Sequence, residues 1–417
     1  MKRIIALIFS LFLFTPSFAQ QREVESAQTE KLEQLDEAVK NLQKIKISGY
    51  VQAQSQWGEK DASLNVGTPN ENPNESFNRI GIRRGFLKVD FEEGIASGTL
   101  QFDMTERGFS LKDAYLNVYD PLFRSNALRA GIFNRPFGYE ISYSSWKRES
   151  PERSAIIRTL FPEERDLGAM LIIQAAKTSP MNFLKLEAGL FAGNGIKQET
   201  DSRKDFIGHL SAMKDISGHL TISGGVSYYH GSVYQGSENV YQMVGESFVL
   251  NNNPDNLGKF AKREYIGFDG QFKIKNILGA TQLRGEYLFG KQPGNLSNSK
   301  SPNASVLPVS DTYLRNFGGG YVALTHDFTT LPFSVVLKYD WYDPNTKVAG
   351  NNIGLNHTGS GDIAQNAFGF GMLWYMNSKL LLQAYYEINK NEKTANLTTF
   401  TNDRKDNVFT LRMQYKF

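Results

Sequence analysis

Apolar and polar side chains alternate along most of the chain after residue 46. At the end of the chain, every second position is apolar or aromatic and the positions between are mostly polar or charged; the apolar set is Phe409, Leu411, Met413, Tyr415 and Phe417. Successive side chains of a β-strand point to opposite faces of the sheet. The pattern therefore predicts a strand with one apolar face and one mostly polar face.

The same alternation predicts sixteen strands in all. They cover residues 46–57, 79–92, 97–106, 110–119, 126–134, 166–177, 182–193, 204–214, 218–230, 262–275, 279–290, 316–328, 332–342, 365–376, 379–390 and 406–417. Every second link is short, as at residues 93–96. Apart from a short link near Gly108, the intervening links are long and rich in Asn, Ser, Gly and Pro, and they cover residues 58–78, 135–165, 194–203, 231–261, 291–315, 343–364 and 391–405.

An even number of such strands, with short turns at one end and longer loops at the other, is typical of outer-membrane barrels. We therefore predict an all-β fold, a 16-stranded antiparallel transmembrane β-barrel over residues 46–417. Side chains at the apolar positions would face lipid, and side chains at the polar positions between them would face a water-filled lumen. A secreted β-sandwich, propeller or solenoid shares the two-residue period. Strand length, alternating link length and the lack of a short internal repeat favour the barrel.

Residues 1–19 have the organisation of a secretory signal peptide. Lys2 and Arg3 precede an apolar run from Ile4 to Phe14, and small residues precede Gln20. A short membrane anchor is the alternative, but the run is too short to span a bilayer as a helix. We predict cleavage after residue 19 and export from the cytoplasm.

Residues 20–45 differ from the rest of the chain. They are polar, free of Gly and Pro, and rich in helix formers. Apolar residues recur at steps of three and four, at Leu32, Leu35, Val39 and Leu42. This spacing predicts a short periplasmic helix or coiled coil that could support oligomer formation; a solvated tail is the alternative.

Composition and motifs narrow the function. The chain has no cysteine, so disulfides and thiolate sites are excluded. Its net charge of +3 gives no support to a nucleic-acid partner. The five histidines lie outside any HExxH or GxSxG motif, and we expect neither a cofactor nor a metal. We predict that the chain is not an enzyme, although a Ser/His pair on adjacent strands would escape a sequence motif.

The link at residues 135–165 is the strongest candidate for a functional segment. Its length would allow it to fold into the barrel, and acidic side chains are interleaved with its basic ones. A surface loop with paired charges is the alternative. The basic residues that could form a pore constriction and contact anions are Arg135, Lys147, Arg148, Arg153, Arg158 and Arg165.

The alternation along the predicted strands gives a second set of basic residues that would face the lumen and could contact anions. Guanidinium and ammonium groups suit phosphate because they donate charge-assisted hydrogen bonds, which gain strength in a narrow pore. These residues are Arg84, Lys88, Arg129, Lys185, Arg284, Lys338 and Arg412.

Several segments in the same order resemble the phosphate-selective porin O and P family. They are RIGIRRGFLKVDF, LKDAYLNV, GIFNRPFGYE, ERDLGAML and FGFGMLWYMNSKLLLQAYYEIN. The resemblance implies a sixteen-stranded, trimeric outer-membrane porin of a Gram-negative-type bacterium, with a third external loop that narrows the channel. It also implies that the C-terminal stripe from Phe409 to Phe417 is a signal for the barrel-assembly machinery.

The sequence departs from the family pattern in one segment. Phosphate-specific members carry basic residues in a later inward loop, but GSVYQGSENVYQMVGESFVLNNNPDN contains no Lys or Arg. The lumen-facing parity also carries acidic residues, at Asp90, Asp103, Asp113, Glu187, Asp269, Glu286, Asp340 and Glu387. We expect passive diffusion of small hydrophilic solutes or anions, with phosphate as the candidate preferred anion. The alternative is a barrel with a closed lumen that acts as an adhesin, scaffold or secretion accessory through its external loops.

Overall fold

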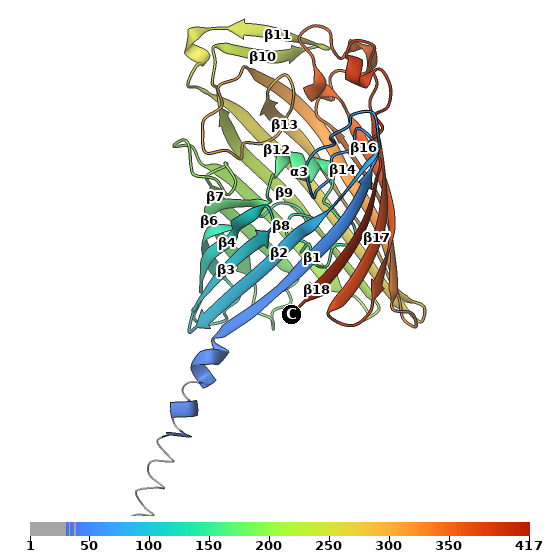
Figure 1. The fold of residues 1–417 in the computed structure, drawn as a ribbon. Coiled ribbons are helices and arrows are strands. Elements are labelled where there is room, and N and C mark those ends of the chain that lie inside the picture. Colours follow the sequence, from blue (N-terminus) through green and yellow to red (C-terminus); the bar gives the residue numbers. More distant parts are fainter. Residues whose placement is uncertain (1–30, 33, 37–38) are drawn as a thin grey trace, which may run out of the picture.

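The computed structural model describes residues 31, 32, 34–36 and 39–417. The predicted signal peptide therefore lies outside the described residues. The described residues between 31 and 43 are helical, and this segment extends away from the barrel at the start of β1 (Figure 1). No helix in the described part of the chain is long and apolar enough to cross a membrane.

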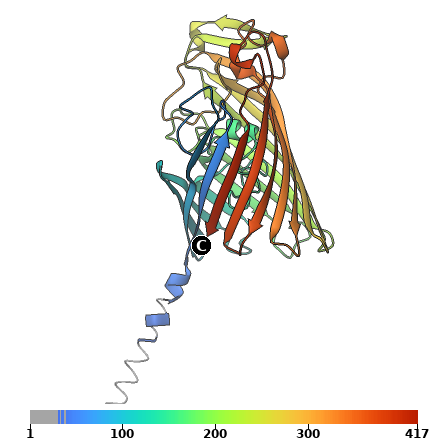
Figure 2. The same ribbon diagram turned by 45° about the vertical axis from the view of Figure 1, so that its right-hand side comes forward.

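Sixteen antiparallel strands close into a barrel, which confirms the predicted fold class (Figures 1 and 2). β18 pairs with β1, so that Lys416 lies opposite Tyr50 and the barrel has no free edge. The barrel strands are β1 (Ile45–Gly58), β2 (Phe77–Glu93), β3 (Ala96–Thr105), β4 (Gly108–Tyr119), β5 (Ala127–Asn134), β6 (Arg165–Gln174), β7 (Leu184–Phe191), β8 (Asp205–Asp215), β9 (Leu220–Tyr234), β12 (Phe260–Asn276), β13 (Gly279–Gly294), β14 (Thr312–Phe328), β15 (Phe333–Asp343), β16 (Gln365–Tyr375), β17 (Leu380–Asn391) and β18 (Val408–Lys416).

The wall of the barrel is low on one side and tall on the other. β3 to β7 have 8 to 12 residues each, whereas β12, β13 and β14 have 16 or 17. A hairpin of β10 (Asn239–Val244) and β11 (Ser247–Asn252) lies above the tall side, in a link predicted to lack strands. β10 is anchored there because it pairs in parallel with the start of β14, Val240 opposite Thr312.

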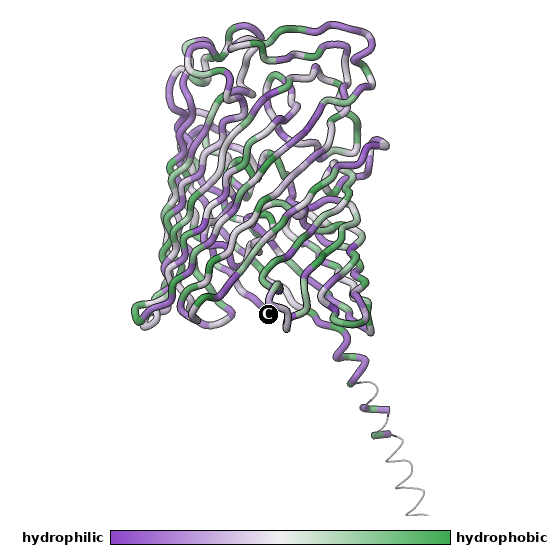
Figure 3. The backbone as a smooth tube through the Cα atoms, turned by 180° about the vertical axis from the view of Figure 1, so that it is seen from behind, coloured by the Kyte–Doolittle hydropathy of each residue, from purple (hydrophilic) through white to green (hydrophobic). Residues whose placement is uncertain are grey.

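The outward-facing and inward-facing side chains of the strands have different surroundings. On the outer surface, Leu337 and Met413 are 47% and 52% exposed, whereas inward-facing Gln54 and Arg412 are each 2% exposed. Figure 3 shows hydrophobic and hydrophilic positions alternating along the strands. The apolar side chains therefore form an unpacked outer belt, and the polar side chains are covered inside the barrel. This is the inverse of a water-soluble β-sandwich.

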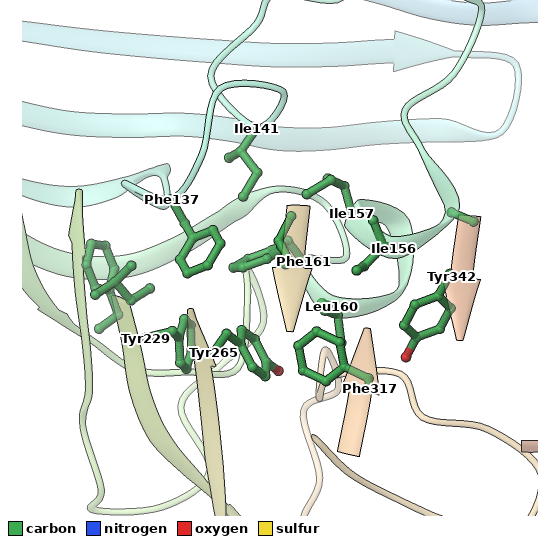
Figure 4. Packing of buried hydrophobic residues seen from close by; sticks show 14 of the residues in the cluster. Phe137, Ile141, Ile156, Ile157, Leu160, Phe161, Tyr229, Tyr265, Phe317 and Tyr342 are labelled. Carbon is green, nitrogen blue, oxygen red and sulfur yellow. The ribbon is translucent and has the colours of Figure 1, made fainter. Parts of the chain in front are cut away.

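The largest apolar cluster of the protein lies inside the barrel. The loop of residues 135–164, named L3 here, connects β5 and β6 and contains the short helix α3 (Ala155–Leu160). Ile156, Ile157 and Leu160 of this helix are fully buried. With Phe161 they pack against inward-facing aromatic side chains of β9, β12, β14 and β15, which are Tyr229, Tyr265, Phe317 and Tyr342 (Figure 4).

Phe161 lies at the centre of this cluster. Its ring centroid is 5.0 Å from that of Phe137, 5.8 Å from that of Tyr265 and 6.1 Å from that of Tyr229, the last two at steep interplanar angles. Such edge-to-face pairs add to the stabilisation from burial. The apolar side of L3 is thus fixed to the inner wall on the tall side of the barrel.

Replacement of Phe161 by Ala should release this side of L3. We expect the free energy of unfolding to fall by about 3–5 kcal/mol, because a buried ring is lost and a cavity remains. Denaturant unfolding of the refolded protein measures the change. Phe123→Ala, at a 67% exposed position in the β4–β5 turn, is the matched control and should have little effect. Equal unfolding midpoints for the two variants would contradict the assignment of this cluster as the anchor of L3.

Candidate functional site

The polar part of L3 crosses the lumen from the apolar cluster to the opposite wall. The Ser145 hydroxyl lies 2.6 Å from the hydroxyl of Tyr50 on β1. The side-chain amide of Gln414 on β18 donates to the Trp146 carbonyl at 3.0 Å, and that of Gln383 on β17 donates to a carbonyl of L3. L3 therefore contacts strands on both sides of the barrel and divides its interior.

Ion pairs between the loop and the wall hold L3 at this position. Glu140 accepts from Lys338 on β15 at 2.8 Å, and Glu149 pairs with Arg284 on β13. Further along the loop, Glu152 pairs with arginines of β2 and β18, and Glu163 pairs with Lys112 on β4. Each of these loop carboxylates meets a cation supplied by a strand. Removal of one partner from a buried pair leaves an uncompensated charge, so these contacts resist displacement of the loop.

Three of the six predicted constriction residues are paired with carboxylates. Arg135 and Asp166 form a fully buried pair at 3.1 Å where L3 leaves the wall. Arg153 pairs with Glu164 at 2.5 Å and also donates to backbone carbonyls within L3. Arg165 pairs with Asp113 at 2.8 Å and with Glu164 at 3.2 Å. The positive charges of these three arginines are therefore neutralised by carboxylates of L3 and of the adjoining strands.

The other three differ in exposure. Arg148 is buried and donates to the carbonyls of Ser150 and Pro151. Lys147 is exposed and lies over the Trp146 ring. Arg158 projects from α3 and is exposed, and within the described chain it forms no ion pair. Of the six, Arg158 is the one that is exposed, lacks an ion pair in the described chain and lines the cavities described next.

Most of the lumen-facing basic residues are also paired. Arg129 is the exception: its Nε donates to the Asn117 side chain at 2.8 Å, and its guanidinium lies 4.3 Å from the centre of the Tyr115 ring. The others lie against a carboxylate on the same strand or on L3; these are Arg84, Lys88, Lys185, Arg284, Lys338 and Arg412. These basic residues therefore do not form a continuous row of unpaired positive charges along the wall.

A cavity of about 920 Å³ lies between L3 and strands β1 to β5. It extends from Lys46 and Phe417, at the end with short links, to Asn65 and Asn303 in the long links. Ten of its lining residues are basic and six are acidic. The lining cations that lack a carboxylate partner among the described residues are Lys46, Arg129, Arg158 and Lys416.

A second cavity of about 320 Å³ lies towards the end with long links. Its lining has the opposite balance, with five acidic and three basic residues. The two cavities share Asn65, Glu152 and Arg158 in their linings. Arg158 is thus located where an acidic outer cavity meets a more basic inner one.

The sequence did not single out Lys46, Asn65 or Lys416 as site residues. The parity of the strands was a usable signal for both lysines, because each faces inward at the end of its strand. No such signal existed for Asn65, which lies in a long link. Its position in both linings depends on how that link folds.

The histidines line neither of these cavities, and two of them have a hydrogen-bond partner on another strand. His209 lies 2.9 Å from Asp269, and His326 lies 2.8 Å from the Thr281 hydroxyl. In the described part of the chain, no group of three or more His, Cys, Asp or Glu side chains is arranged to hold a metal ion.

Comparison with known proteins identifies the fold. No protein-family model and no curated protein matches the chain. Among solved structures, OprB of Pseudomonas putida is 10% identical with a TM-score of 0.58, and the match covers 91% of this chain and 96% of OprB. An anion-selective porin from Comamonas acidovorans is 12% identical with a TM-score of 0.54 and coverage of 89% and 99%. OmpT of Vibrio cholerae in its trimer form is 10% identical with a TM-score of 0.53 and coverage of 89% and 99%. The chain therefore has the barrel fold of porins.

The ion pairs of L3 should give the loop a defined sensitivity to acid. Burial opposes ionisation of Glu140 and Glu164, but the charges of Lys338 and Arg153 outweigh it and lower the pKa of each to about 2, from an ordinary value of 4.5. A carboxyl group with a lowered pKa stabilises the folded state above its ordinary pKa and loses this effect as the pH falls through its folded pKa. L3 should therefore loosen between pH 4.5 and pH 2.

Cleavage of the refolded protein by pepsin across this pH range measures the loosening. In Lys338→Met the pKa of Glu140 should rise, and cleavage in L3 should begin at a higher pH than in the unmodified chain. Cleavage that begins at the same pH in both proteins would show that this pair does not hold the loop.

Proposed function

We propose that this protein is a porin of a bacterial outer membrane and that it allows passive diffusion of small hydrophilic solutes. The observation that carries the proposal is the charged cavity between L3 and β1–β5, whose lining extends from one end of the barrel towards the other. The exposed apolar belt supports a membrane location, since such a belt meets hydrocarbon in transmembrane barrels. The fold shared with OprB, OmpT and the Comamonas porin agrees with both points.

We infer a mild preference for anions. The inner cavity has an excess of basic side chains, and four of them have no carboxylate partner in the described chain. The passage needs no chemical step, because aperture and lining charge alone set selectivity in such channels. The anion selectivity in the name of the Comamonas porin is consistent with this inference.

Phosphate is the preferred anion that the sequence resemblance suggests. Exposed Arg158, at the junction of the two cavities, would be its first contact. The carboxylates of L3 limit this preference, because they cover most other arginines of the interior. We therefore place phosphate among several permeant anions.

We further propose a homotrimer in the membrane. The low wall of β3 to β7 offers an apolar surface to a neighbouring copy, with Leu100, Leu116, Leu128 and Leu171 between 47% and 66% exposed. OmpT, one of the structural neighbours, is described as a trimer. Delivery to the membrane by the barrel-assembly machinery, through the terminal stripe that ends at Phe417, belongs to the same proposal.

Arg158 should set part of the anion preference. In planar bilayers under a potassium chloride gradient, Arg158→Gln should move the reversal potential towards cation preference and weaken any block by phosphate, because one uncovered charge is lost from the passage. Arg107→Gln is the matched control, since Arg107 is exposed in the short β3–β4 link and lines neither cavity. Identical reversal potentials in both variants would contradict the role of Arg158.

A folded barrel that conducts no ions would contradict the porin proposal itself. That result would favour the alternative in which the lumen is closed and the external loops act as an adhesin, scaffold or secretion accessory.

If the outer belt contacts lipid, a charged side chain introduced there should lower the stability of the barrel. Leu337 lies in the middle of β15 and is 47% exposed. Leu337→Lys should destabilise the barrel in lipid vesicles by about 2–4 kcal/mol, because the ammonium group would meet hydrocarbon. The control is Leu331→Lys in the β14–β15 turn, where the residue is 53% exposed. Denaturant unfolding in vesicles compares the free energies of unfolding of the two variants. Equal values would show that the outer belt does not contact the lipid.

A further inference from the structure

One carboxylate of L3 is surrounded by three arginines of the wall. Glu152 receives two hydrogen bonds from Arg83, at 2.7 and 2.8 Å, and one from Arg84 at 3.0 Å. Arg412 of β18 donates to it at 3.3 Å. The Glu152 side chain is 11% exposed, and those of Arg84 and Arg412 are 7% and 2% exposed. Four N–H donors thus converge on the two oxygens of one carboxylate.

The arginines are supplied by the wall and are positioned partly by neutral groups. Arg84 donates to the Gln52 side chain at 3.1 Å. Arg412 donates to the Gln54 side chain at 2.9 and 2.7 Å. Both glutamines belong to β1 and bring no charge. The arrangement of Arg84 and Arg412 therefore does not depend on Glu152 alone, and β1, β2 and β18 would still present two oriented guanidinium groups without it.

Convergent guanidinium groups bind any planar or tetrahedral oxyanion that offers several acceptor oxygens. The carboxylate of Glu152 has the same acceptor chemistry as a free carboxylate or phosphate. Glu152, Arg83 and Arg84 also line the inner cavity, so a solute in that cavity can reach these three side chains. Arg412 is not part of the lining and meets the cluster from the wall, through its contact with Glu152. The position of Glu152 is that of a ligand supplied by the protein itself.

We propose that Arg83, Arg84 and Arg412 form an oxyanion-binding site of the passage and that Glu152 occupies it as a tethered competitor. This inference rests on the proposed porin function. Because Glu152 is attached to L3, its effective concentration at the arginines is high, on the order of millimolar or more. A permeating anion displaces it only at high concentration. Glu152 thereby keeps the passage open to several anions and prevents tight retention of phosphate.

Neutralisation of Glu152 tests the proposal. Glu152→Gln keeps the shape of the side chain but removes the competing charge. In bilayers, inorganic phosphate should then block the chloride current at a concentration at least about tenfold lower than in the unmodified protein, since the arginines gain charge-assisted hydrogen bonds to phosphate. Heat-modifiable migration on gels shows whether the variant is folded, and Glu152→Ala provides a second variant with the competitor removed.

Glu163→Gln is the matched control. Glu163 lies on the same loop, lines the same cavity and pairs with Lys112. Its neutralisation removes the same charge from the cavity but leaves Glu152 on the three arginines. Both variants should therefore move the reversal potential towards chloride, and only the Glu152 variants should gain the phosphate block. Addition of Arg412→Gln to Glu152→Gln should reverse that gain.

Equal phosphate block in the Glu152 and Glu163 variants would overturn the proposal, because it would show that only the overall charge of the cavity matters. A folded protein without any conductance would instead reject the porin function. Calorimetric titration of the refolded proteins with phosphate then still decides the binding site: tighter binding to Glu152→Gln than to Glu163→Gln supports it, and equal binding rejects it.

Discussion

The docking of L3 on the inner wall is the interaction on which the rest of the structure depends. A sixteen-stranded barrel without an inward loop leaves a wide aqueous channel. Here an apolar helix of L3 packs on the tall side of the barrel, and carboxylates of the loop pair with cations of β13 and β15 on that side and of β2 and β18 across the lumen. Buried apolar side chains and paired carboxylates alternate along L3, as at Glu140 and Ile141, and together they fix the path of L3 across the lumen.

The position of L3 determines both the place and the lining charge of the large cavity. Packing on β9 and β12 to β15 fills one side of the interior, so the large cavity remains beside β1 to β5. The pairs that hold the loop also neutralise six cations of the wall, which are Arg83, Arg84, Lys112, Arg284, Lys338 and Arg412. The large cavity is lined by many basic residues but by only a few that lack a carboxylate partner in the described chain, and the modest anion preference proposed above rests on these few.

The sequence predicted the barrel well because strand alternation is a local property. Each of the sixteen predicted strands lies within a few residues of an observed one. The β10–β11 hairpin was missed because its two strands have only six residues each and are anchored by the pairing of β10 with β14, a contact distant in sequence. The pairing of charges was not predictable either, since Glu140 and Lys338 meet only through the path of L3. Inward-facing aromatic residues such as Tyr229 and Tyr265 were an available sign that something apolar covers the wall.

The most direct test of this account is cross-linking between L3 and the wall. The chain has no cysteine, so introduced thiols are the only reactive ones. Gln52 donates to the Ser145 carbonyl at 3.2 Å. We predict that Gln52→Cys and Ser145→Cys, combined in the refolded protein, are joined rapidly by a short thiol-reactive cross-linker, whereas each single variant gives no intramolecular product. A double variant that remains folded but is not cross-linked would show that L3 does not cross the lumen, and it would contradict the account.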